Sequence, residues 1–208
     1  MTLPRALTPS NIINKKRMIL QFENEWFRAF GKIEANARIL VWGGSGQGKT
    51  RFVIQLAKYL SRYVRIAYNS LEMGDSMALG DALMQEEAHK NIIILNRENT
   101  DQVLTRMKRR KSPECLITDS LQYLRDAEGN GLNYKRYIKL NGELPDKLLV
   151  FVSHADGKEP AGRVAKSIRY DVDVKIFVQG FKAFVTSRYG GGDPITIWDE
   201  GAKEYWGL

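Results

Sequence analysis

The sequence contains few of the residues that form disulfides and metal clusters. Its 208 residues include one cysteine and two histidines. A single cysteine cannot form an intramolecular disulfide, and so few Cys and His side chains argue against a zinc site built from them. Cys115 lies in an apolar run and is expected to be a small buried side chain. The composition therefore favours a protein of a reducing compartment.

Long apolar runs are missing as well. The longest uninterrupted run, residues 148–152, is far shorter than the ~20 residues that cross a bilayer as a helix. The N-terminus also lacks the apolar segment of an export signal. We therefore expect a protein that does not enter a membrane and that stays in the cytoplasm.

The residues that are present are enough for a core and carry a basic surplus. The chain is 43% hydrophobic and 27% charged, which is typical of a globular protein of about one domain. Its 32 basic and 24 acidic residues leave a net charge of +8. Residues 1–32 and 97–111 supply +4 each. This surplus suits an anionic partner such as nucleic acid, and it equally suits two solvated basic faces.

The first 32 residues differ in pattern from the rest. Ser10 is expected to cap a helix that runs to about Phe30, where Gly31 would end it. This helical lead-in, residues 1–32, could contribute to oligomerisation or pack on its own core. Residues 33–208 are expected to form one domain.

From residue 38 onward, short β-rich runs alternate with helical stretches. Strands are predicted at 38–42, 64–69, 91–95, 115–118, 148–153 and 173–178, and helices at 49–63 and 100–111. The strongest runs are continuously apolar, which is typical of strands buried on both faces of a parallel sheet. The last runs, 173–178, 183–187 and 195–198, are joined by glycine-containing turns and predict antiparallel hairpins. The expected fold is α/β: a mostly parallel sheet flanked by helices, with C-terminal antiparallel β-hairpins.

A glycine-rich segment between the first strand and the first long helix has the pattern G-x-x-x-x-G-K-T. In this frame, backbone N–H groups and the helix N-terminus bind a polyphosphate. Lys49 would reach the β- and γ-phosphates, and the Thr50 hydroxyl would ligate Mg²⁺. The dinucleotide pattern G-x-G-x-x-G fails because Lys49 occupies its third glycine position. The predicted nucleotide-binding residues are Gly43, Gly44, Ser45, Gly46, Gln47, Gly48, Lys49 and Thr50.

Two acidic residues follow predicted strands. Asp119 ends the apolar run 115–118, and Glu72 follows the strand 64–69. Ligands of open α/β sheets bind at the carboxyl ends of the strands. Asp119 is therefore a candidate Mg²⁺ ligand, with a turn-capping residue as the alternative. Glu72 is the candidate base for water, with an ordinary surface glutamate as the alternative.

These segments together resemble the RecA-type P-loop ATPases. The glycine-rich loop, Ser70-Leu71-Glu72-Met73 and the run from Ile117 to Tyr123 are similar to the ATPase domain of DnaB-like replicative helicases. The resemblance covers residues 38–198 and implies a RecA-like ATPase domain that uses ATP and Mg²⁺. It gives Glu72 the catalytic role and Asp119 the metal. It also implies that His154 senses the γ-phosphate and that Arg188 reaches the nucleotide of a neighbouring copy in a ring or filament.

The chain also departs from that family. The sensor is usually Gln, whereas this sequence has His154, and 30 residues cannot supply the N-terminal domain of such a helicase. The chain is closer in these respects to minimal RecA-core recombination proteins of phages. The implied setting is the cytoplasm of a bacterial or phage-infected cell.

The resemblance places DNA contacts in the segments 125–134 and 155–169. The first is a poor phosphate binder by charge. The second is the better candidate, although an ordinary polar loop is the alternative. Its basic residues are Lys158, Arg163, Lys166 and Arg169. The basic run 106–111 is read as a solvated helix end, and Asp171 and Asp173 as edge or turn residues.

The expected function is a Mg²⁺-dependent ATPase that acts on single-stranded DNA in replication or recombination. The alternative is an ATP-driven regulatory or assembly module that acts on a protein partner without DNA. A small-molecule P-loop kinase is a third possibility.

Overall fold

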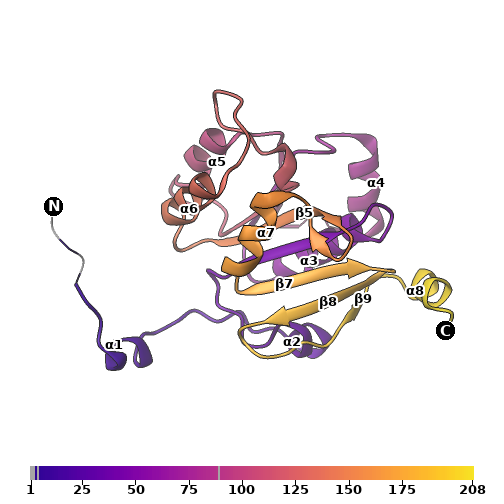
Figure 1. Cartoon of the computed structure of the whole chain (residues 1–208), viewed down its shortest axis with the longest axis horizontal. Helices are drawn as coiled ribbons and strands as arrows, with labels where there is room; N and C mark the ends of the chain where they lie inside the picture. The colour runs from indigo at the N-terminus through magenta and orange to yellow at the C-terminus, as the bar shows by residue number, and fades with distance from the viewer. Residues whose placement is uncertain (1–2, 4, 89) are drawn as a thin grey trace.

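The computed structural model describes residues 3, 5–88 and 90–208, and within them a single nine-stranded sheet organises the chain (Figure 1). The strand order is β3-β2-β4-β5-β1-β7-β8-β9, with β6 paired to β5. The strands are β1 Arg38–Gly43, β2 Ile66–Ser70, β3 Ile92–Asn96, β4 Cys115–Asp119, β5 Leu148–Asp156, β6 Glu159–Pro160, β7 Val174–Gln179, β8 Lys182–Ser187 and β9 Ile195–Thr196.

The sheet is parallel from β3 to β7 and antiparallel beyond it. β1 pairs in parallel with β5 on one side and with β7 on the other, and β7, β8 and β9 follow as antiparallel hairpins. The central strands β2 and β4 are buried along their whole length, as their continuously apolar pattern predicts. The α/β fold with C-terminal antiparallel hairpins is thus confirmed.

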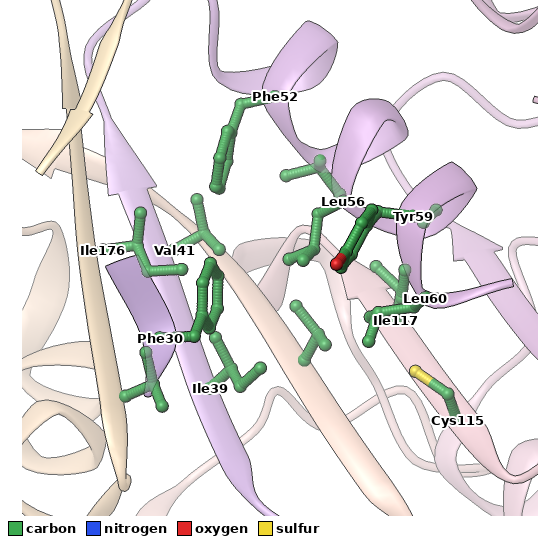
Figure 2. Packing of buried hydrophobic residues seen from close by; sticks show 14 of the residues in the cluster. Phe30, Ile39, Val41, Phe52, Leu56, Tyr59, Leu60, Cys115, Ile117 and Ile176 are labelled. Atoms are coloured by element: carbon green, nitrogen blue, oxygen red, sulfur yellow. The ribbon is translucent and has the colours of Figure 1, made fainter. Parts of the chain in front are cut away.

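Helices cover both faces of the sheet. They are α1 Pro9–Ile13, α2 Asn24–Phe30, α3 Lys49–Leu60, α4 Met77–Gln85, α5 Thr100–Met107, α6 Tyr134–Glu143, α7 Gly162–Asp171 and α8 Asp199–Trp206, with a 3₁₀ turn at Leu121–Tyr123. One core lies under α2, α3 and α4, and Figure 2 shows Phe52, Leu56 and Leu60 of α3 meeting β1 and β4 there. The other core lies under α5, α6 and α7.

The N-terminal segment differs from its prediction. The expected helix from Ser10 to Phe30 is wrong: two short helices, α1 and α2, are separated by extended chain, and Thr8 rather than Ser10 caps the first. Leu20 and Phe22 in the extended part are buried in the core. Gly31 does end α2, at a backbone φ of 71°. Packing of these apolar side chains at the edge of the core prevails over the local helical pattern.

No helix among the residues described here is long and apolar enough to cross a membrane.

Candidate active site

The glycine-rich loop connects β1 to α3, as the motif requires. Gly48 precedes α3 with φ of 90°, a left-handed conformation that favours glycine, and no side chain caps the helix. A Cβ at Gly43 would lie 2.5 Å from the Val178 carbonyl oxygen, whereas one at Gly46 would meet nothing within 4 Å. The loop is thus tight against β7 at its start and open at its crest. An open crest beside an uncapped helix N-terminus fits a polyphosphate.

The loop is also attached to the turn between β7 and β8. The Gly180 N–H donates to Gln47 Oε1 at 2.7 Å, and the Phe181 N–H donates to the Gln47 carbonyl oxygen at 3.2 Å. These contacts hold the back of the loop, away from the cavity. The sequence suggested only that Gln47 is a variable position of the motif, so this anchoring role was missed.

A cavity of about 300 Å³ opens in front of the loop. Lys49 lies at its floor, where Nζ donates to the Gly43 carbonyl oxygen at 3.4 Å. Two acidic groups from other strands share the cavity, Glu72 after β2 and Asp119 at the end of β4. The tertiary structure thus brings the predicted base and the predicted metal ligand to the same cavity. Its lining is Gly44, Ser45, Gly46, Gly48, Lys49, Thr50, Arg51, Glu72, Met73 and Asp119.

The Glu72 carboxylate contacts two neighbouring side chains. Its Oε2 lies 3.0 Å from His154 Nε2 and 3.3 Å from the Ser120 hydroxyl, which donates to it. Partial burial raises the pKa of Glu72, but the hydrogen bond and charge of His154, with Lys49 and Ser120, outweigh it, so the pKa is lowered overall. Glu72 is therefore ionised at neutral pH, as a group that accepts a proton from water must be.

Asp119 occupies a drier position than Glu72. It is 7% exposed and accepts a hydrogen bond from the Tyr68 hydroxyl on the neighbouring β2. Burial raises the pKa of Asp119, and burial together with the Asp119 charge raises that of Tyr68. The Thr50 hydroxyl and this carboxylate are the hard oxygen donors that Mg²⁺ prefers, and both line the cavity. These residues therefore fit the metal.

Gln122 connects the two strands that carry Asp119 and His154. Its Nε2 donates to the Ser153 hydroxyl at 2.9 Å and to the Ala161 carbonyl oxygen at 3.2 Å. It thereby joins the turn after β4 to the end of β5 and the start of α7. Gln122, Tyr68 and Ser120 were not among the predicted site residues. Gln122 and Ser120 lie in the same motif as Asp119, which is the signal that could have found them.

No protein-family model matches the sequence, and no curated protein matches it. Solved structures do. The flagellar accessory protein FlaH from Methanocaldococcus jannaschii is similar with a TM-score of 0.59 and 14% identity, over 87% of this chain and 92% of that one. A DnaB-like replicative helicase has a TM-score of 0.55 and 16% identity, over 77% of this chain and 54% of that one. An ATPase domain has 0.56 and 16%, over 82% and 84%.

The chain has a RecA-like ATPase fold.

In this RecA-like fold, Arg188 lies at the opposite edge of the sheet from the loop of its own chain. β8 runs antiparallel to β7, so Ser187 pairs with Val174 at the amino end of β7. Arg188 Nη1 lies 3.4 Å from Asp173 Oδ1, and Nη2 donates to the Tyr170 carbonyl oxygen at 3.2 Å. The six residues of β8 separate it from the loop by about 20 Å at about 3.3 Å per residue. Arg188 is therefore not brought together with the other predicted site residues.

The segment 155–169 of the RecA-like fold is not a loop, and that prediction is wrong. It comprises the end of β5, β6 and most of α7, because Ala165 and Ile168 face the core one helical turn apart. Two of its four predicted DNA contacts form ion pairs, Lys166 with Asp156 at 3.8 Å and Arg169 with Glu159 at 2.5 Å.

Arg163, at the start of α7, lines a second cavity together with Arg125 from the segment 125–134. Lys158 lies in the tight turn between β5 and β6, where its carbonyl oxygen accepts from Trp42 Nε1. The basic run 106–111 is partly neutralised, since Arg106 pairs with Glu98 and Lys108 with Glu143.

Proposed function

We propose that this RecA-like chain is a Mg²⁺-dependent ATPase that acts on DNA in replication or recombination, assembled as a ring or filament with nucleotide between copies. The observation that carries the proposal is the convergence of Lys49, Glu72 and Asp119 on one cavity in front of the loop. The cavity combines a cation for phosphate, a carboxylate for metal and a carboxylate for water.

The roles follow from the environment of each group. The loop and Lys49 would bind the β- and γ-phosphates, while Thr50 and Asp119 would hold Mg²⁺, which neutralises phosphate charge when bound. Glu72, ionised and held by His154 and Ser120, would align the attacking water and accept its proton. His154 adjoins Glu72 and would contact the transferring phosphoryl group, as the resemblance to the helicase domain implies.

Two substitutions test the chemistry. Lys49→Ala should weaken ATP binding, because the loop loses its cation. Glu72→Gln should keep ATP binding and lower turnover by about 10²-fold or more, because the amide cannot accept a proton. Binding is measured by calorimetry and turnover by phosphate release. Turnover that survives both substitutions would rule out this mechanism.

The DNA part of the proposal is supported by the similarity to a DnaB-like replicative helicase and by two arginines, Arg125 and Arg163, that line one cavity beside the turn after β4. Single-stranded DNA should stimulate turnover, and the stimulation should fall steeply between low and high salt because phosphate contacts release counterions. Arg163→Ala should reduce the stimulation more than Lys166→Ala, since Lys166 pairs with Asp156. Equal rates with and without DNA at both salt concentrations would exclude a DNA-directed role. The cytoplasm of a bacterial or phage-infected cell is the setting that this role implies.

The second candidate is an ATP-driven assembly module that acts on a protein partner. Similarity to an archaeal flagellar accessory protein over most of both chains favours it, as does the ion pairing of Lys166 and Arg169. This candidate predicts oligomers that depend on nucleotide and ignore DNA. Sedimentation with ATP, with and without single-stranded DNA, separates the two.

A further inference from the structure

The N-terminal arm, the described residues from Leu3 to Met18, has no place in the core of its own chain. All of these residues are exposed, and burial begins only at Leu20. The arm nevertheless contains an ordered turn, α1, which Thr8 and Asn11 close by a reciprocal capping box. Ile12 and Ile13 on this turn are 51% and 77% exposed. A capped turn that presents two isoleucines to solvent is a surface without a partner.

The helix α4 presents a second apolar surface. Met77 and Met84 are 83% and 77% exposed and lie two helical turns apart on one face. Gly80 lies between them, and a Cβ there would meet nothing within 4 Å, so the face has a notch at its centre. Leu79 is the only fully buried residue of α4 among those described. Two flexible methionines around a notch form a surface that adapts to inserted aliphatic side chains.

The two surfaces carry opposite charge. The arm has four basic residues and no acidic ones, whereas residues 75–87 have four acidic residues and no basic ones. Three of these eight charges already have partners: Arg17 pairs with Glu34, Glu86 with Arg51 and Glu87 with Lys58. In the described part of the chain, no ion pair engages the other five, which are Arg5, Lys15, Lys16, Asp75 and Asp81.

The arm and α4 of one chain lie far apart. The arm leaves the molecule where Ala35 N–H donates to the Met18 carbonyl oxygen, just before β1 at the amino edge of the sheet. Helix α4 follows β2 from the carboxyl edge. Figure 1 shows α1 and α4 at opposite ends of the molecule. Complementary surfaces at opposite ends of one chain join successive copies head to tail.

We propose that the arm of one copy docks on α4 of the next copy, with Ile12 and Ile13 against Met77 and Met84. Lys15 and Lys16 then face the acidic flank of α4. The docked arm would adjoin the nucleotide cavity, because α4 follows Glu72 closely and ends beside Glu86, which pairs with the cavity residue Arg51 at 2.6 Å. The inference gives a contact to the assembly part of the proposed function and does not depend on hydrolysis.

Cross-linking between two differently tagged chains tests the contact directly. One full-length chain carries Ile13→Cys and the other Met84→Cys, and the mixture is oxidised mildly with and without Mg-ATP. The native Cys115 does not compete, since it is fully buried and burial raises the pKa of its thiol. We expect a disulfide between the two tags, at several times the yield of a control in which Tyr170→Cys replaces Met84→Cys. Tyr170 is 75% exposed and lies on α7, away from α4.

A yield equal to the control in both conditions would overturn the proposal. So would cross-linking that stays within one chain when both substitutions are placed together in a dilute sample, because the arm would then fold back on its own α4.

A charge exchange gives a second measurement. Lys15→Glu with Lys16→Glu, and separately Asp75→Lys with Asp81→Lys, should each weaken self-association by about tenfold in sedimentation. All four substitutions in one chain should restore it, and a failure to restore would also overturn the proposal. ATP binding is measured on the same chains. Lost cross-linking with intact ATP binding would refute the arm contact alone, and lost ATP binding with intact cross-linking would refute the proposed function alone.

Discussion

Glu72 is held in place at both ends of its residue. Its backbone N–H donates to the Asp119 carbonyl oxygen at 3.2 Å, and its carboxylate contacts Ser120 and His154. All three partners come from β4, the turn after it, or β5. A change in the spacing of β2, β4 and β5 would therefore move the proposed base, the metal ligand and the sensor relative to one another.

Glu114 shows at the residue scale how an ion pair away from the cavity should affect stability. Its Oε1 lies 2.6 Å from Arg65 Nη2, and this hydrogen bond, against partial burial, lowers the pKa of Glu114 overall. A carboxyl whose folded pKa is depressed stabilises the fold above its unfolded pKa of about 4.3. That stability is lost as the pH falls through the folded pKa.

We predict that Glu114→Gln lowers the urea midpoint at pH 7 by a small amount, since the pair is partly exposed, and that its difference from wild type shrinks below pH 4. The measurement is urea unfolding at a series of pH values. A difference that stays constant with pH would contradict it.

At the scale of elements, α8 is coupled to the phosphate loop through a single turn. Trp206 Nε1 donates to the Gly180 carbonyl oxygen at 3.0 Å, and the Gly180 N–H holds Gln47. Gly180 has φ of 53°, and a Cβ there would lie 2.3 Å from the Tyr205 ring. The turn between β7 and β8 therefore transmits the position of α8 to the loop.

We predict that Gly180→Ala lowers the free energy of unfolding by about 1–3 kcal/mol and weakens ATP binding several-fold, because α8 must move and Gln47 loses its anchor. Urea unfolding and calorimetry measure the two effects. The matched control is Gly142→Ala in α6, where the Cβ meets nothing within 4 Å. It should be neutral or stabilise by about 0.5–1 kcal/mol. Unchanged ATP binding in Gly180→Ala would show that the turn does not support the loop.

At the scale of the whole molecule, the position of Arg188 makes an assembly prediction. It lies beside Asp173 at the amino edge of the sheet, with the whole length of β8 between it and its own loop. In the proposed assembly it would serve the nucleotide of a neighbour, where an arginine stabilises charge on the transferring phosphoryl group.

We therefore predict complementation between two inactive chains. Lys49→Ala cannot hold ATP but keeps Arg188, and Arg188→Ala holds ATP but lacks the arginine. Their mixture should hydrolyse ATP at a substantial fraction of the wild-type rate, whereas each alone should be slower by about 10²-fold or more. Phosphate release is the readout. Arg188→Ala that is as active as wild type would refute the role in a neighbour.

Patterns within contiguous stretches account for what was predicted correctly. The β-rich runs gave the strands within two or three residues, and the three final runs gave the antiparallel hairpins. The segment 162–171 was read as part of a loop because of Gly157, Gly162 and its charges, although Ala165 and Ile168 are spaced for one helical face. Burial against the second core decided that segment, and burial depends on residues far away in the chain.

The sequence by itself determined the order of strands and helices, the α/β class and the phosphate loop, because each depends on residues that are neighbours in the chain. Only the tertiary structure decided that β1 lies between β5 and β7 and that Glu72, Asp119 and His154 meet. It also decided that Arg188 lies at the far edge and that the arm has no place in its own core. These properties depend on how strands pair and which surfaces are buried together, and no local pattern contains that information.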